Sequence, residues 1–188
     1  MSQPRYLLSE EEYLAKERAA DFKSEFYAGE MFAMAGASRK HNVITNNLGG
    51  ELRARLRDKP CEVYTSDMRV KVTPTGLYTY PDVVVACDKP EFEDAEVDTL
   101  LNPRLIAEVL SESTRDYDRG GKSNHYRQIP SLLEYLIVNQ AEINVELLSR
   151  QADGSWRLTE TRDRGAVIHL ESLDCEVPVE EIYAKVAF

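Results

Sequence analysis

The amino-acid sequence predicts an α+β fold, an α/β sandwich in which a mixed β-sheet is flanked by helices. One indication is the order of the expected elements, since a helix and a set of strands are followed by another helix and more strands. A second is that the segments 80–86 and 105–110 are almost entirely apolar, which is typical of strands buried on both faces. A chain of 188 residues is also long enough to bury such a core as one domain.

Helices are predicted by capping residues, by apolar residues at intervals of four and by prolines. Ser9 and Glu12 form a capping-box pattern, and Ser113 or Thr114 can cap a later helix. The expected helices cover a dozen or so residues after Ser9, then 38–58, then about 116–128, and finally the residues after Pro178.

Strands are predicted by runs of β-branched and aromatic residues. Gly29-Glu30 lies between two aromatic-rich runs and predicts a hairpin turn. The other expected strands cover 61–65, 68–72, 77–86, 104–111, 134–139, 143–150, 155–161 and 166–170.

The charge balance is acidic but unevenly distributed. The net charge is −10 at pH 7, which counts against a nucleic-acid binder, because such proteins are usually basic. Eight basic residues lie within 39–71 against four acidic ones, whereas 88–98 holds six acids. Local fields can therefore differ in sign from the total, and DNA would be expected to approach over 39–71. A solvated acidic loop and an ordinary helix face explain the pattern equally well.

The cysteines bear on the cellular compartment. Cys61, Cys87 and Cys175 stand far apart with no CxxC spacing, and three cannot all pair. We therefore expect reduced thiols, a cytoplasmic location and no zinc knuckle. No signal-peptide pattern or membrane-length apolar stretch is present, so we expect no membrane partner.

Two acids stand where acids are unusual. Asp82 and Glu108 are each the lone charged residue of an apolar strand segment. An ionised carboxylate there is costly unless it is paired or coordinates a metal. Two carboxylates from neighbouring strands would form a hard-oxygen site suited to Mg²⁺. In the alternative interpretation, both acids are structural and form salt bridges with Arg104 or Arg119.

Several short motifs follow one another in a fixed order. They are Pro81-Asp82, Glu108-Val109-Leu110-Ser111, the stretch from Arg115 to Lys122, Tyr126, and the stretch from Glu134 to Val138. In this order they resemble the Uma-type family of endonucleases, in the PD-(D/E)xK restriction-endonuclease-like superfamily. The Gly29-Glu30 hairpin and the stretches 36–41 and 171–183 fit as well. The resemblance implies a single restriction-endonuclease-like domain over 1–188, with its core at about 22–183.

The resemblance also implies a function, that of a Mg²⁺-dependent endonuclease acting on DNA, with Mn²⁺ able to substitute. Asp82 and Glu108 would bind the metal, together with the backbone carbonyl of Val109. Lys122 would orient or activate the attacking water and offset charge on the phosphate. A homodimer is left open.

One position departs from the superfamily pattern, which has a lysine two residues after the glutamate, on the same face of the strand. Leu110 occupies that position, so we expect the lysine to come from the following helix, as Lys122. The acidic net charge and Leu110 favour a catalytically inactive binding or regulatory module. The presence of Asp82, Glu108 and Lys122 together favours an active nuclease.

Three further residues are accessory candidates for the site, and each has a plainer interpretation. Glu30 fits a turn, and His41 near a helix start fits an exposed polar position. Tyr126 lies one helical turn from Lys122 and fits either the cleft or the core.

Overall fold

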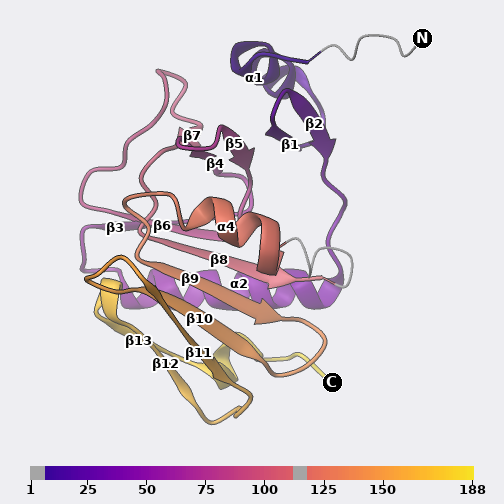
Figure 1. Cartoon of the computed structure of the whole chain (residues 1–188). Coiled ribbons are helices and arrows are strands. Elements are labelled where there is room, and N and C mark those ends of the chain that lie inside the picture. The colour runs from indigo at the N-terminus through magenta and orange to yellow at the C-terminus, as the bar shows by residue number, and fades with distance from the viewer. Residues whose placement is uncertain (1–6, 112–117) are drawn as a thin grey trace.

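The computed structural model describes residues 7–111 and 118–188 of the chain (Figure 1). The helical elements are α1 (Glu10–Ala19), α2 (Arg39–Arg55), the π-helical turn η1 (Asp118–Lys122), α4 (Ser123–Tyr126), the 3₁₀ turn η2 (Glu171–Leu173) and α5 (Val179–Ile182). The strands are β1 (Ser24–Tyr27), β2 (Glu30–Ala33), β3 (Cys61–Thr65), β4 (Arg69–Val72), β5 (Leu77–Thr79), β6 (Val83–Cys87), β7 (Thr99–Leu100), β8 (Leu105–Leu110), β9 (Glu134–Asn139), β10 (Val145–Arg150), β11 (Trp156–Thr161), β12 (Val167–Leu170) and β13 (Cys175–Pro178).

Within the described ranges the strands form three sheets, and helices flank them as predicted. The largest has the order β11-β10-β9-β8-β6-β3 and is mixed, because β8 and β9 are parallel while its other neighbours are antiparallel. A second sheet has the order β2-β1-β5-β4-β7, and β12 pairs with β13. Helix α2 runs along one side of the large sheet and α4 lies on the other (Figure 1).

The two faces of β8 explain how the layers pack. Leu105, Ala107 and Val109 point into the core shared with α2, whereas Ile106 and Leu110 point into a second core beneath α4. Side chains alternate along a strand, so Glu108 belongs to the second face. The stripe of apolar residues predicted for α2 is confirmed, and its members are buried: Ile44, Leu48, Leu52 and Leu56.

Local signals placed most elements correctly. The Ser9–Glu12 capping box is present at the start of α1. The hairpin turn lies one residue before the predicted Gly29-Glu30, at Ala28 and Gly29, which both have the positive φ of a two-residue turn, and Glu30 already begins β2. The helix expected over 116–128 is shorter where it is described, a π-helical turn followed by α4. Its predicted cap at Ser113 or Thr114 lies outside the described residues.

The single strand expected over 77–86 is wrong. The chain forms β5, leaves the sheet at Tyr80 and Pro81, and begins β6 in the other sheet. Proline has no N–H to donate to a ladder, so a strand is readily interrupted there. The interruption brings Asp82 to the very start of β6.

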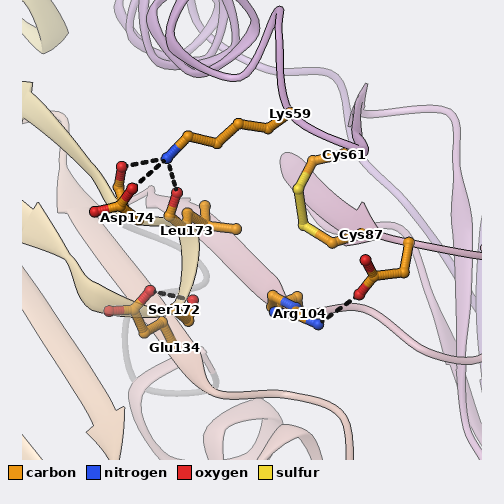
Figure 2. Close-up of a disulfide and its surroundings, with 9 residues drawn as sticks. Lys59, Cys61, Cys87, Arg104, Glu134, Ser172, Leu173 and Asp174 are labelled. Atoms are coloured by element: carbon orange, nitrogen blue, oxygen red, sulfur yellow. Dashed lines mark hydrogen bonds and ion pairs between the residues drawn. A yellow bond between two sulfur atoms is a disulfide. The ribbon is translucent and has the colours of Figure 1, made fainter.

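The expectation of three reduced thiols is also wrong. Cys61 and Cys87 form a disulfide, and Figure 2 shows it between β3 and β6. The two residues are direct partners in the antiparallel register, with Cα atoms 3.9 Å apart. Distance along the sequence therefore said nothing about their distance in the fold. Cys175 is a free, half-buried thiol. Among the described residues, no helix has the length and apolarity to cross a membrane.

Candidate active site

Asp82 and Glu108 meet at the start of β6, as predicted. The register pairs Val83 with Ala107, so the next residues outward face each other. The Asp82 N–H donates to Glu108 Oε2 at 3.3 Å, and the Val109 N–H donates to Asp82 Oδ2 at 2.8 Å. These two reciprocal bonds hold both carboxylates against the same short stretch of backbone.

Glu108 is almost completely buried, with 4% of its surface exposed. Burial raises the pKa of Glu108, Lys122 opposes that rise, and the neighbouring Asp82 and Asp118 add to it. The Tyr126 hydroxyl donates to Glu108 Oε1 at 2.7 Å and favours the ionised form. Burial and the neighbouring acids therefore favour the protonated carboxyl, whereas a cation beside it favours the ionised one.

Lys122 enters the site from the π-helical turn η1. Its Nζ lies 2.9 Å from Glu25 Oε1, 3.3 Å from Glu108 Oε1 and 3.5 Å from Asp118 Oδ1. Burial lowers the pKa of Lys122, but the three carboxylates outweigh it and the net shift is upward. The ammonium is therefore charged and directed at Glu108, as we predicted for a lysine supplied by the helix.

The accessory candidates divide into two groups. Tyr126 contacts Glu108 and is fully buried, so it belongs both to the site and to the core. His41 Nε2 lies 3.1 Å from Asp82 Oδ2, and its Nδ1 is 3.5 Å from the Thr45 hydroxyl one turn further along α2. Glu30 begins β2 opposite Tyr27, and its part in the site stays a prediction.

Sequence reasoning missed three polar residues of this cluster. Glu25 on β1 pairs with Lys122 and accepts a hydrogen bond of 2.6 Å from the Thr79 hydroxyl on β5. Asp118 lies one turn before Lys122. Glu25 could have been found as an acid inside the aromatic-rich run before the hairpin turn. Asp118 could have been found from its spacing, four residues before Lys122 in the motif.

The purely structural interpretation of the two acids is not supported. Arg104 pairs with Asp88 at 3.0 Å, and Arg119 pairs with Glu146. Neither arginine has a salt bridge to Asp82 or Glu108 among the described contacts.

The basic segment 39–71 does not form one open cationic surface. Within it, Arg55 pairs with Glu51, Lys59 with Asp174, Arg69 with Asp98, and Lys71 with both Glu10 and Glu93. The acidic loop 88–98 supplies two of these partners, Glu93 and Asp98, so it is not simply a solvated loop. The N-terminal end of α2, which carries His41, is the part of this segment that reaches the site.

The donor set fits a hard divalent cation. Asp82 Oδ1 accepts no hydrogen bond from the described residues, and Glu108 Oε2 accepts only the long bond from the Asp82 N–H. The site offers two carboxylate side chains rather than three, since no group of three or more acidic, histidine or cysteine side chains in the described part of the chain is arranged to hold a metal. Two carboxylates and a carbonyl would leave positions for water and phosphate oxygen, which suits Mg²⁺ because it retains several waters.

Comparison with known proteins gives a family and a fold. Residues 10–180 match the Uma2 family model, described as "Putative restriction endonuclease". Two proteins of Synechocystis sp., both described as uncharacterized, are similar. The protein sll1609 is 41% identical over 162 residues, covering 86% of this chain and 92% of its own, and slr1290 is 36% identical, covering 100% and 97%. A crystal structure from Anabaena variabilis, titled a putative nuclease belonging to DUF820, superimposes with a TM-score of 0.76 at 13% identity. It covers 94% of this chain and 98% of its own.

Proposed function

Because the chain belongs to the Uma2 family, with a nuclease-like fold, we propose that it is a metal-dependent endonuclease that hydrolyses phosphodiester bonds in DNA. The observation that carries the proposal is the meeting of two carboxylates, Asp82 and Glu108, with the Lys122 ammonium 3.3 Å from Glu108 Oε1. Acids and a buried cation in that arrangement match the needs of phosphoryl chemistry, which is catalysed mainly by positioning and electrostatics.

The roles follow from the contacts. Asp82, Glu108 and the Val109 carbonyl would hold Mg²⁺ or Mn²⁺. When bound, the metal would act as a Lewis acid on the phosphate and lower the pKa of its water. Lys122 supplies a fixed positive charge that offsets charge developing on the phosphate, and its three carboxylate partners keep it protonated. Tyr126 favours the ionised, ligating form of Glu108.

His41 has a separate task in this proposal. Its imidazole Nε2 contacts Asp82 Oδ2, the oxygen that also accepts a hydrogen bond from the Val109 N–H. These two contacts leave Oδ1 as the oxygen available to a cation. Thr45, at 3.5 Å from the second ring nitrogen, helps to orient the imidazole.

A cleavage assay with matched variants tests the proposal. Supercoiled, linear and single-stranded DNA would be incubated with Mg²⁺ or Mn²⁺ and either the wild type or Asp82→Ala, Glu108→Gln or Lys122→Met. Glu134→Gln is the control, because Glu134 is an equally buried acid that bonds to Ser172 and is not among the contacts of the site. We expect cleavage by the wild type and the control only.

Calorimetric titration of Mn²⁺ separates the two parts of the site. We expect binding to be greatly weakened by Asp82→Ala and by Glu108→Gln and retained by Lys122→Met, because an ammonium cannot be a metal ligand. Metal binding without cleavage of any substrate would contradict the endonuclease proposal and leave the inactive binding module as the better account.

A further inference from the structure

Two aromatic side chains on the β1–β2 hairpin stand beside the site without being part of it. Tyr27 is 39% exposed and Phe32 is 48% exposed. Two other aromatic residues with described burial are exposed, Phe22 and Phe188, whereas five are fully buried: Tyr13, Tyr78, Tyr126, Tyr135 and Tyr183. An exposed ring is unremarkable alone, but two on one face of one hairpin next to a polar site call for an account.

The register fixes which way these rings point. Phe32 is the direct cross-strand partner of Glu25, and Phe26 pairs with Tyr78, which sets Glu25 opposite Thr79 on the next strand. Directly opposed residues project to the same face of a sheet, with Cβ atoms about 5 Å apart. Phe32, Glu25 and Thr79 therefore form one row across β2, β1 and β5.

That row runs outward from the site. Thr79 donates to Glu25, and Glu25 pairs with Lys122 at 2.9 Å. Phe32 is the outermost member, on the edge strand β2, one strand away from the residue that holds Lys122. A group that lies on its ring is therefore one strand away from Glu25, the partner of Lys122.

Tyr27 confirms the direction of the face. It is two residues from Glu25 on the same strand, so both side chains project from the same side. Its ring packs edge-on against the His125 ring of α4 with centroids 4.7 Å apart. This contact fixes the tyrosine beside the segment that carries Lys122 while leaving much of the ring exposed.

We propose that Tyr27 and Phe32 form a stacking platform for unpaired nucleic-acid bases, so that the site prefers DNA that is single-stranded next to the scissile phosphate. This inference rests on the proposed function, because it names the substrate class of the same site. Aromatic rings bind bases through their faces regardless of sequence. Bases within a duplex are stacked on each other and cannot lie on such a platform without leaving the stack. Four of the eight basic residues of the 39–71 segment are held in ion pairs, Arg55, Lys59, Arg69 and Lys71, which leaves fewer cations to track a duplex backbone.

The test measures binding rather than cleavage. A short oligonucleotide containing 2-aminopurine, alone or in a duplex, would be titrated in Ca²⁺, which takes the same oxygen ligands as Mg²⁺. Gel electrophoresis of the same samples verifies that the strands stay intact. Phe32→Ala removes the ring and Phe32→Trp keeps one. Leu158→Ala is the matched control, because Leu158 is a 56% exposed apolar residue on β11, in the other sheet.

We expect the wild type to bind the single strand about tenfold more tightly than the duplex, and Phe32→Ala to lose about tenfold for the single strand only. Phe32→Trp and Leu158→Ala should keep wild-type affinity. Equal single-strand binding by Phe32→Ala and the wild type would overturn the proposal. So would a loss of dimer mass with Phe32→Ala in sedimentation at unchanged single-strand affinity, because the rings would then be covered by a second copy.

The outcomes also separate this inference from the proposed function. If cleavage depends on Asp82 and Lys122 but Phe32→Ala binds and cuts single strands normally, the endonuclease proposal stands and the platform is wrong. If no substrate is cut and single-strand binding still depends on Phe32, the platform stands and hydrolysis is wrong.

Discussion

Lys122→Met removes an ammonium from a cluster of buried acids while keeping an unbranched apolar side chain in its place. Glu25, Glu108 and Asp118 are 9%, 4% and 3% exposed, so water can solvate little of the negative charge that is left without its cation. Removing one partner of a buried ion pair typically costs about 3–5 kcal/mol, because it leaves an uncompensated buried charge. Glu108 can relieve part of this cost by taking up a proton, so we expect the lower end, about 3 kcal/mol near pH 7 without metal.

Urea denaturation of the wild type and Lys122→Met in EDTA, between pH 5 and 9, measures this loss. The difference between the two proteins should shrink as the pH falls, because protonated carboxyls no longer repel one another. Adding Mn²⁺ should restore part of the lost stability, since a ligand stabilises the state that binds it. Glu25→Gln combined with Lys122→Met should cost less than the sum of the single changes, because the two residues are direct partners.

Lys71→Met is the matched control for this experiment. Lys71 is 14% exposed at its side chain and lies between Glu10 and Glu93 at 2.7 and 2.6 Å, outside the described contacts of the site. It should also lose stability, but Mn²⁺ should stabilise it by the same amount as the wild type, because its metal site is intact, so its deficit relative to the wild type should stay constant. A Lys122→Met protein within about 1 kcal/mol of the wild type in EDTA would refute the view that this lysine neutralises the acid cluster. If the deficit relative to the wild type shrank equally in both variants on addition of Mn²⁺, a metal site beside Lys122 would be refuted.

Three further predictions concern single features of the structure. Because burial raises the pKa of Glu108 to about 8, Mn²⁺ must displace a proton below that pH, so the calorimetric affinity for Mn²⁺ should rise with pH until Glu108 is ionised. The same raised pKa means that the protonated Glu108 carboxyl contributes stability that is lost as the pH rises through the folded-state pKa. In urea titrations Glu108→Gln should flatten this decline in the free energy of unfolding, and an equal decline in the variant would show that Glu108 is not its source. Tyr126→Phe removes the 2.7 Å hydrogen bond to Glu108 and should weaken Mn²⁺ binding near pH 7 about tenfold, whereas unchanged affinity would show that the hydroxyl does not tune the carboxyl. Replacing Cys61 and Cys87 together by serine should cost about 3.5 kcal/mol in urea, from release of a crosslink spanning 26 residues, and an unchanged midpoint in non-reducing buffer would contradict the crosslink.

The sequence predicted those features of the fold that depend on neighbouring residues. The capping box at Ser9, the apolar stripe of α2 and the bounds of β3 and β9 follow from local chemistry and spacing, and each is confirmed. The meeting of Asp82 with Glu108 was also predictable, because a lone carboxylate in an apolar strand must find compensation somewhere. A family resemblance then indicated the lysine.

The features that escaped prediction depend on pairings between distant segments. Cys61 and Cys87 became partners only because β3 and β6 align them, and spacing along the chain carries no information about that register. Glu25 was not singled out in the sequence, because only the pairing of β1 with β5 places it beside Lys122. The basic segment looked open because most of its ion-pair partners lie far from it in the sequence. They are Glu10 in α1, Glu93 and Asp98 in the 88–98 loop and Asp174 just before β13, and composition alone cannot bring these segments together.

The position of Leu110 explains why the lysine had to come from elsewhere. Leu110 lies on the same face of β8 as Glu108, but it is 1% exposed and packs into the core beneath α4. A lysine there would bury an ammonium among apolar side chains, which is costly without a partner. Lys122 in η1 instead contacts Glu108 of β8 and Glu25 of the β1–β2 hairpin. The Lys122 ammonium is thus compensated by acids from three segments, β1, β8 and η1, and the N-terminal hairpin contributes one of them. Substitutions in β1 that remove Glu25 should therefore disturb Lys122 as surely as substitutions in β8.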